Sequence, residues 1–176
     1  MIIDLQAVTE ETRVQEVLNQ DWWRVTDPSQ QVLGFACPLQ VDVKVSKAAD
    51  KFLVDGTLAG WIRVRCDRCL EPFDLELKST FNVYLVMKPS GPSEEDVELL
   101  DEDMEVEFVK GEMMDLDDII REQVYLSVPM KCVCKSDCRG LCPQCGANLN
   151  VAPCSCRSEV GHAAFSKLEN LKFQGD

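Results

Sequence analysis

Hydrophobic and polar residues alternate through much of the first half of the chain. Between residues 32 and 87 apolar side chains recur at every second position in several successive stretches. A period of two places the apolar side chains of a strand on one face and the polar ones on the other. The pattern therefore predicts a run of antiparallel strands with one face in water. The apolar positions include Val41, Val43, Val45, Phe52, Val54, Leu58, Ile62, Val64, Phe73, Leu75, Leu77, Phe81, Val83, Leu85 and Met87.

Two stretches carry helical spacing instead. Residues 9–20 begin with Thr9, a candidate N-cap, and their apolar side chains are loosely spaced for a helix. Residues 115–127 place apolar side chains on one face and acidic ones in the first turn, where they suit the positive end of a helix. Pro129 disfavours helical geometry at the residue before it and ends this helix. The apolar face of the second stretch consists of Leu116, Ile119, Ile120 and Val124.

These elements predict an α+β protein built on an antiparallel β-sheet with a few helices. A short strand is expected at Val106 and Phe108, and a terminal helix would carry Phe165, Leu168 and Leu171. Closure of the sheet into a barrel-like form is one arrangement that the pattern allows. We expect a mainly β domain over residues 1–130 and a Cys-rich module over residues 131–176.

The negative charge of the chain is concentrated in one segment. The 176 residues include 31 acidic and 18 basic side chains, for a formal net charge of −13. Residues 94–118, the acidic segment, hold 13 acidic side chains and one lysine. Such a run is typical of a solvated stretch, and the alternative is a polyanion mimic that docks a basic protein. The overall charge argues against general binding to nucleic acid, where affinity comes from cations placed on phosphates.

Membrane and secretory classes are not expected. The chain has no apolar run of 18 residues, and its first residues lack the basic and apolar regions of a secretory signal. We therefore expect a cytoplasmic protein. With His162 as the one histidine, and with no Gly-rich phosphate loop or nucleophile–histidine pair, we expect a non-catalytic protein. An enzyme acting on RNA is the minority hypothesis.

Most of the ten cysteines are clustered, which favours metal ligation over disulfides in a reducing cytoplasm. The strongest local signal is Cys142-Pro-Gln-Cys145-Gly146, followed by Cys154-Ser-Cys156. Two residues between thiolates let both sulfurs bind one ion, and the glycine relieves a tight turn. We predict a four-cysteine, zinc-ribbon-like site here, and iron would suit the same ligands.

A second CxxC pair, Cys66 and Cys69, lies between two predicted strands, where a hairpin would turn. Two thiolates make half of a tetrahedral zinc site, so two further ligands are needed. Cys134 and Cys138 remain for this role after the first assignment, which predicts two zinc ions in all. Cys132 competes with Cys134, and this alternative stays open.

A redox role is the competing hypothesis for the Cys66–Cys69 pair. Thioredoxin-like pairs lie at a helix N-terminus after a strand, whereas strand-like sequence flanks this pair on both sides. A zinc-thiolate redox switch is therefore the alternative function. Cys37 stands alone in an apolar strand stretch and is expected to pack rather than to bind metal.

Three arginines, Arg63, Arg65 and Arg68, cluster around the Cys66–Cys69 pair. One interpretation is a small basic spot that contacts RNA phosphates. The interpretation that we favour is pairing with the acidic segment, or compensation for the negative charge of a zinc tetrathiolate.

The stretch from Val64 to Phe73, VRCDRCLEPF, resembles the signature of the YceD family, known as the large ribosomal RNA subunit accumulation protein. The stretch from Cys134 to Asn150, CKSDCRGLCPQCGANLN, is similar to the tail of several bacterial members. The resemblance covers most of the chain, although residues 159–165 are more polar than the family's tail.

The resemblance implies a role in large ribosomal subunit assembly and in accumulation of its RNA, with no established enzymatic activity. It implies a ribosomal protein or a pre-ribosomal particle as the partner, while direct binding to RNA would be weak because of the acidic segment. It also implies that the CxxC pair is completed at the positions of Cys134 and Cys138.

Overall fold

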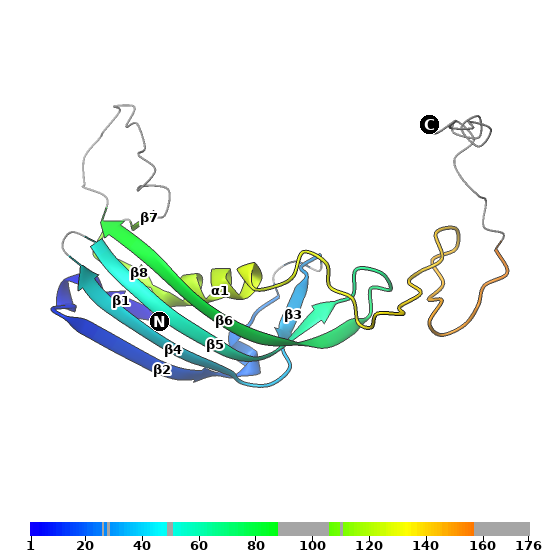
Figure 1. Ribbon diagram of the computed structural model, residues 1–176, viewed down its shortest axis with the longest axis horizontal. Helices are drawn as coiled ribbons and strands as arrows, with labels where there is room; N and C mark the ends of the chain where they lie inside the picture. The colour runs from blue at the N-terminus through cyan, green and yellow to red at the C-terminus, as the bar shows by residue number, and fades with distance from the viewer. Residues whose placement is uncertain (26, 28, 49–50, 88–105, 110, 157–176) are drawn as a thin grey trace, which may run out of the picture.

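The computed structural model describes residues 1–25, 27, 29–48, 51–87, 106–109 and 111–156. Figure 1 shows a long twisted sheet with a helix along one side and the Cys-rich segment extending from one end. In chain order the elements are β1 (Ile2–Asp4), the 3-10 turn η1 (Leu5–Ala7), β2 (Glu11–Leu18), η2 (Gln20–Trp22), β3 (Val32–Phe35), β4 (Leu39–Ala48), β5 (Lys51–Arg65), β6 (Pro72–Met87), β7 (Val106–Val109), β8 (Met113–Asp115) and α1 (Leu116–Leu126).

The predicted run of antiparallel strands is confirmed as the main sheet. Within the described residues its strand order is β2-β4-β5-β6-β7, with β3 paired to β5. The pairs β2–β4, β4–β5, β3–β5 and β5–β6 are antiparallel. The pair β6–β7 is parallel, which the length of the intervening residues 88–105 permits. A separate short antiparallel pair joins β1 to β8.

The alternation of side chains places the core on one face of this sheet. Val41, Val43 and Val45 of β4 are buried, as are Phe52, Val54, Leu58, Ile62 and Val64 of β5. Helix α1 packs its buried apolar residues into the same hydrophobic cluster. The apolar face of the sheet is therefore covered by the helix.

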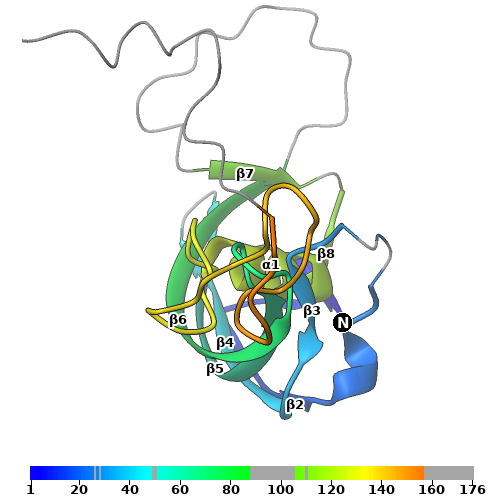
Figure 2. The same ribbon diagram turned by 90° about the vertical axis from the view of Figure 1, so that its right-hand side faces the viewer.

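The expectation of a barrel-like sheet is wrong. Among the described residues no ladder joins β2 to β7, so the sheet is open. Figure 2, along the long axis, shows that the sheet curves around α1 instead of closing on itself. The physical reason is that α1 already shields the apolar face from water, so closure is not needed to bury it.

The helical expectation for residues 9–20 is also wrong. Residues 11–18 form β2, which pairs with β4 from Glu11 opposite Ser46 to Leu18 opposite Leu39. The weak helical spacing of this stretch contributes less than a continuous ladder along a neighbouring strand. Thr9 therefore caps no helix.

The helix expected over residues 115–127 is confirmed. The Asp115 side chain accepts a hydrogen bond from the Asp117 backbone N–H, which caps the first turn. Leu116, Ile119, Ile120 and Val124 are all buried. The helix ends at Leu126, shortly before Pro129. The short strand expected at Val106 and Phe108 is confirmed as β7.

Several expectations fall on residues that the structure does not describe. The terminal helix with Phe165, Leu168 and Leu171, together with His162 and most of the acidic segment, lies outside the described residues. The division at residue 130 stays a prediction. In the described part of the chain, no helix combines the length and apolar character needed to cross a membrane.

Candidate metal centres

The first centre is built on the turn of the β5–β6 hairpin. The Cys66 N–H donates to the Glu71 carbonyl at 2.9 Å, and the Leu70 N–H donates to the Cys66 carbonyl at 2.9 Å. These bonds close the turn and hold the Cys66 and Cys69 side chains on it. Both cysteines are buried.

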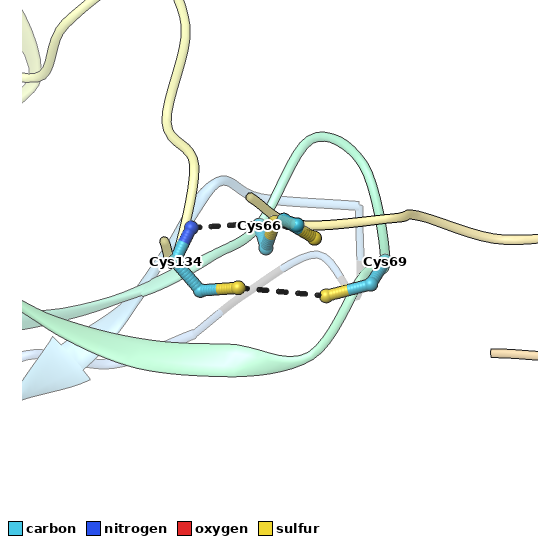
Figure 3. A group of neighbouring side chains, drawn as sticks. Cys66, Cys69 and Cys134 are labelled. Atoms are coloured by element: carbon cyan, nitrogen blue, oxygen red, sulfur yellow. Dashed lines mark hydrogen bonds between the residues drawn. The ribbon is translucent and has the colours of Figure 1, made fainter. Parts of the chain in front are cut away.

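The chain after α1 returns to this turn through a reciprocal pair of contacts. The Asp67 N–H donates to the Cys132 carbonyl at 2.8 Å, and the Cys132 N–H donates to the Asp67 carboxylate at 2.5 Å. The Cys134 N–H then points at the Cys66 sulfur at 3.5 Å, as Figure 3 shows. This docking brings a segment more than 60 residues away in sequence against the hairpin turn.

Four sulfurs meet at this turn, those of Cys66, Cys69, Cys134 and Cys138. The Cys66 and Cys138 sulfurs are 3.9 Å apart, and the Cys69 and Cys134 sulfurs are 3.8 Å apart. All four lie within 4.8 Å of one another. A tetrahedral ion with metal–sulfur bonds of about 2.3 Å separates its sulfurs by about 3.8 Å. The group therefore has the size of a tetrahedral tetrathiolate site, and its sulfurs are too far apart for disulfides.

The thiols of this group differ in their affinity for protons. Burial raises the pKa of Cys66, but backbone N–H groups of Cys134, Cys69 and Arg68 outweigh it and lower that pKa to about 6. Burial, together with the neighbouring Cys66 sulfur, raises the pKa of Cys134 to about 12. Close sulfurs cannot all carry negative charge without a cation between them. A bound metal ion would supply that positive charge and displace the remaining protons.

The second centre lies in the following loops and gathers Cys142, Cys145, Cys154 and Cys156, whose sulfurs also lie within 4.8 Å of one another. The Gly146 N–H donates to the Cys142 carbonyl at 2.9 Å, and the Cys142 N–H donates to the Ala147 carbonyl at 2.8 Å. Backbone N–H groups of Cys145 and Gln144 lower the pKa of Cys142 to about 6. Cys142 is buried and Cys145 is exposed, so this centre is more open to solvent than the first.

The structure places Cys132 and Cys37 outside both groups. Cys132 directs its S–H to the Pro129 carbonyl at 3.5 Å, because its own backbone is held by Asp67. Cys134, and not Cys132, therefore belongs to the first group. Cys37 is half-buried and lies between β3 and β4 rather than within a strand.

The structure places the three arginines in different surroundings. Arg63 lies on the exposed face of β5 and pairs with Asp74 of β6 at 2.8 Å. Arg68 lies at the first centre, where its guanidinium donates to the Cys138 carbonyl at 2.9 Å. Arg65 ends β5 and its carbonyl accepts a hydrogen bond from the Gln31 side chain.

The sequence interpretation missed two residues that shape the first centre, Asp67 and Asn150. Asp67 anchors the returning chain, and the Asn150 side-chain amide donates to the Cys138 sulfur at 3.3 Å. Asp67 lies inside the CxxC motif, but its partner at Cys132 is distant in sequence. The run Asn148-Leu149-Asn150 by itself indicates only a turn.

Comparison with known proteins places this architecture in a family. The family model described as "Large ribosomal RNA subunit accumulation protein YceD" matches residues 54–172. The chain is 29% identical over 158 residues to a protein of Arabidopsis thaliana described as a chloroplastic homologue of that protein, which covers 78% of this chain and 49% of the relative. It is 26% identical over 146 residues to a similarly described protein of Zea mays, which covers 68% and 49%.

An uncharacterised protein of Mycobacterium bovis is 36% identical over 124 residues, which cover 70% of this chain and 54% of the relative. The chain thus spans about half the length of the curated relatives it matches. No solved structure matches the chain significantly. Because the family model covers both the CxxC hairpin and the distal cysteines, the chain belongs to the YceD family of large ribosomal RNA subunit accumulation proteins.

Proposed function

We propose that this chain is a non-catalytic, zinc-stabilised protein that supports large ribosomal subunit assembly and the accumulation of its RNA. The observation that carries the zinc part is the first centre, where four sulfurs from two distant segments meet at tetrahedral spacing. One ion at each centre would cross-link the hairpin, the returning chain and the distal loops. Four thiolates also suit iron, and elemental analysis distinguishes the two metals.

The ribosomal part of the proposal is supported by the family and by the descriptions of the plant relatives. We propose a cytoplasmic protein whose partner is a basic ribosomal protein or a pre-ribosomal particle. The acidic segment, residues 94–118, would attract such a partner and repel naked RNA. Arg63 already pairs with Asp74, so an RNA phosphate would have to compete with a carboxylate there.

Co-sedimentation with pre-ribosomal particles tests the choice of partner surface. Deletion of residues 94–103 should reduce association with these particles, because the deletion removes much of the negative charge, and the loss should be largest at low salt. The deletion removes no cysteine, so two metal ions per chain should be retained.

The matched variant replaces Arg63, Arg65 and Arg68 with alanine and leaves the acidic segment intact. If the deletion variant still co-sediments with the particles and the arginine variant does not, the proposed protein contact is wrong. The contact would then be made with RNA at the first centre.

The alternative function is a zinc-thiolate redox switch that uses Cys66 and Cys69. The low pKa of Cys66, about 6, favours it, because thiolates are the reactive form of cysteine. Full burial of Cys66 opposes it, because an oxidant needs access. Metal content measured before and after peroxide treatment decides: a structural site keeps both ions, whereas a switch releases one and forms a Cys66–Cys69 disulfide.

A further inference from the structure

The loop of the second centre folds back onto the first centre. Asn150 lies in sequence between Cys145 and Cys154 of the second group, yet its side chain reaches Cys138 of the first. Its Nδ2 atom donates to the Cys138 sulfur at 3.3 Å. A single side chain therefore joins a segment closed by one group of thiols to a sulfur of the other group.

The orientation of the Asn150 amide is set by its other partners. Its Oδ1 atom accepts from the Arg139 backbone N–H at 2.8 Å, which requires the oxygen on that side. Its Nδ2 atom also donates to the Asn148 side-chain oxygen at 3.0 Å, and the Asn150 backbone N–H donates to the same oxygen at 3.0 Å. The amide N–H is thus directed at the sulfur and cannot rotate away without breaking these bonds.

A second set of contacts fastens the same loop to the hairpin turn. The Leu141 N–H donates to the Arg68 carbonyl at 3.0 Å, and Asn148 reaches the Glu71 carboxylate at 3.4 Å. Gly140 has a positive φ of 74°, and a Cβ there would lie 3.0 Å from the Arg68 carbonyl oxygen. The backbone approach therefore requires glycine, and it places the start of this loop, Gly140 and Leu141, against the hairpin turn of the first centre.

We infer that Asn150 is a positioning residue that couples the two metal centres. Metal at the second centre would order the loop that carries Asn150 and hold its N–H on the Cys138 thiolate, which raises the metal affinity of the first centre. Hydrogen-bond partners of metal ligands typically change affinity by about 10–100-fold. By linkage, metal at the first centre raises affinity at the second by the same factor. The inference rests on the proposed metal binding at both centres.

The test is a titration of the full chain with cobalt(II) against a competing chelator, read from the cobalt–thiolate absorption. The double variant Cys142→Ser, Cys145→Ser removes the second centre, and the affinity of the first should then fall by about 10-fold or more. In an Asn150→Ala background the same double substitution should change first-centre affinity by less than about twofold, because the connection is already lost.

Asn150→Ala alone should weaken the first centre and shift its absorption band, because the thiolate loses a hydrogen bond, while both ions still bind. Asn150→Asp keeps the acceptor for the Arg139 N–H but loses the donor, so it should be at least as damaging. Asn19→Asp makes the same amide-to-carboxylate change at an exposed side chain just before η2, outside both cysteine groups, and should leave the first-centre band unchanged.

If removal of the second centre weakens the first equally in chains with and without the Asn150→Ala substitution, the role of Asn150 is overturned. If removal of the second centre leaves the metal affinity of the first centre unchanged, the coupling itself is overturned. Uptake of fewer than two ions by the unmodified chain would instead contradict the proposed metal function, so the two failures are distinguishable.

Discussion

Leu70 and Gly146 follow the second cysteine of their CxxC pairs and occupy equivalent turns. In each turn their N–H donates to the carbonyl of the first cysteine at 2.9 Å, and φ is positive, 61° for Leu70 and 71° for Gly146. Glycine adopts this conformation freely, whereas an L-residue with a Cβ loses roughly 1–2 kcal/mol. Leu70 is 55% exposed, so burial of its side chain offsets little of that strain.

Leu70→Gly should therefore stabilise the metal-loaded chain by about 0.5–1 kcal/mol, after the greater freedom of glycine in the unfolded chain is subtracted. Chemical denaturation with the metal held in excess measures the difference. Gly146→Leu serves as the reciprocal variant and should destabilise. A loss of stability in Leu70→Gly would mean that the leucine side chain makes a stabilising contact in solution.

At the scale of the element, the long strand β5 depends on a glycine beneath an aromatic ring. Gly56 lies opposite Phe81 of β6, and a Cβ at Gly56 would lie 2.2 Å from the Phe81 Cζ atom. The ring is buried in the main cluster, so it has little room to move. The close approach of ring and backbone fixes the register of the hairpin that carries Cys66 and Cys69.

Gly56→Ala should lower the free energy of unfolding by about 1–3 kcal/mol, because the added methyl group overpacks this contact. Thermal or urea unfolding of the metal-loaded protein checks it. Thr57→Ala, on the exposed face of the same strand, is the control and should change stability by less than about 1 kcal/mol. Adding Phe81→Leu to Gly56→Ala should recover part of the loss; no recovery would point to backbone strain rather than to the ring.

At the scale of the whole molecule, the first cysteine group gathers segments that lie far apart in the sequence. The first group joins the β5–β6 turn to the chain after α1, and within the described residues 139–156 only loops surround the second. Structural zinc contributes directly to the stability of such loop-rich regions. Loss of the first site should damage the fold more than loss of the second, because the first group lies at the turn of the main β5–β6 hairpin and the second lies among loops.

The full chain should bind two zinc ions, measured by elemental analysis of the purified protein. Cys66→Ser should lower zinc by about one equivalent and reduce thermal stability, because three thiolates hold zinc poorly. Cys37→Ser should leave the zinc content unchanged, since Cys37 lies outside both groups. Equal zinc loss in the two variants, or one equivalent in the unmodified chain, would contradict the assignment.

Local patterns in the sequence were enough to predict most strands of the main sheet and helix α1. The period-two alternation around Val43 and Val54 identified the strands, because burial of one face repeats along a single element. Helix α1 was predicted from its apolar spacing and from the acidic side chains of its first turn, which are also features of a single element. The spacing of Cys66 with Cys69 likewise depends only on the turn between them, while the ligand role of these cysteines stays a prediction.

Tertiary structure alone decided the features that depend on contacts between distant segments. Residues 11–18 became a strand because β4 lies beside them, and the sheet stayed open because α1 covers its face. Cys134 rather than Cys132 faces Cys66, because Asp67 holds the Cys132 backbone. Asn150 reaches Cys138 only through the folded loop. A one-dimensional pattern records which faces are apolar, but it does not record which distant backbone groups will meet across a turn.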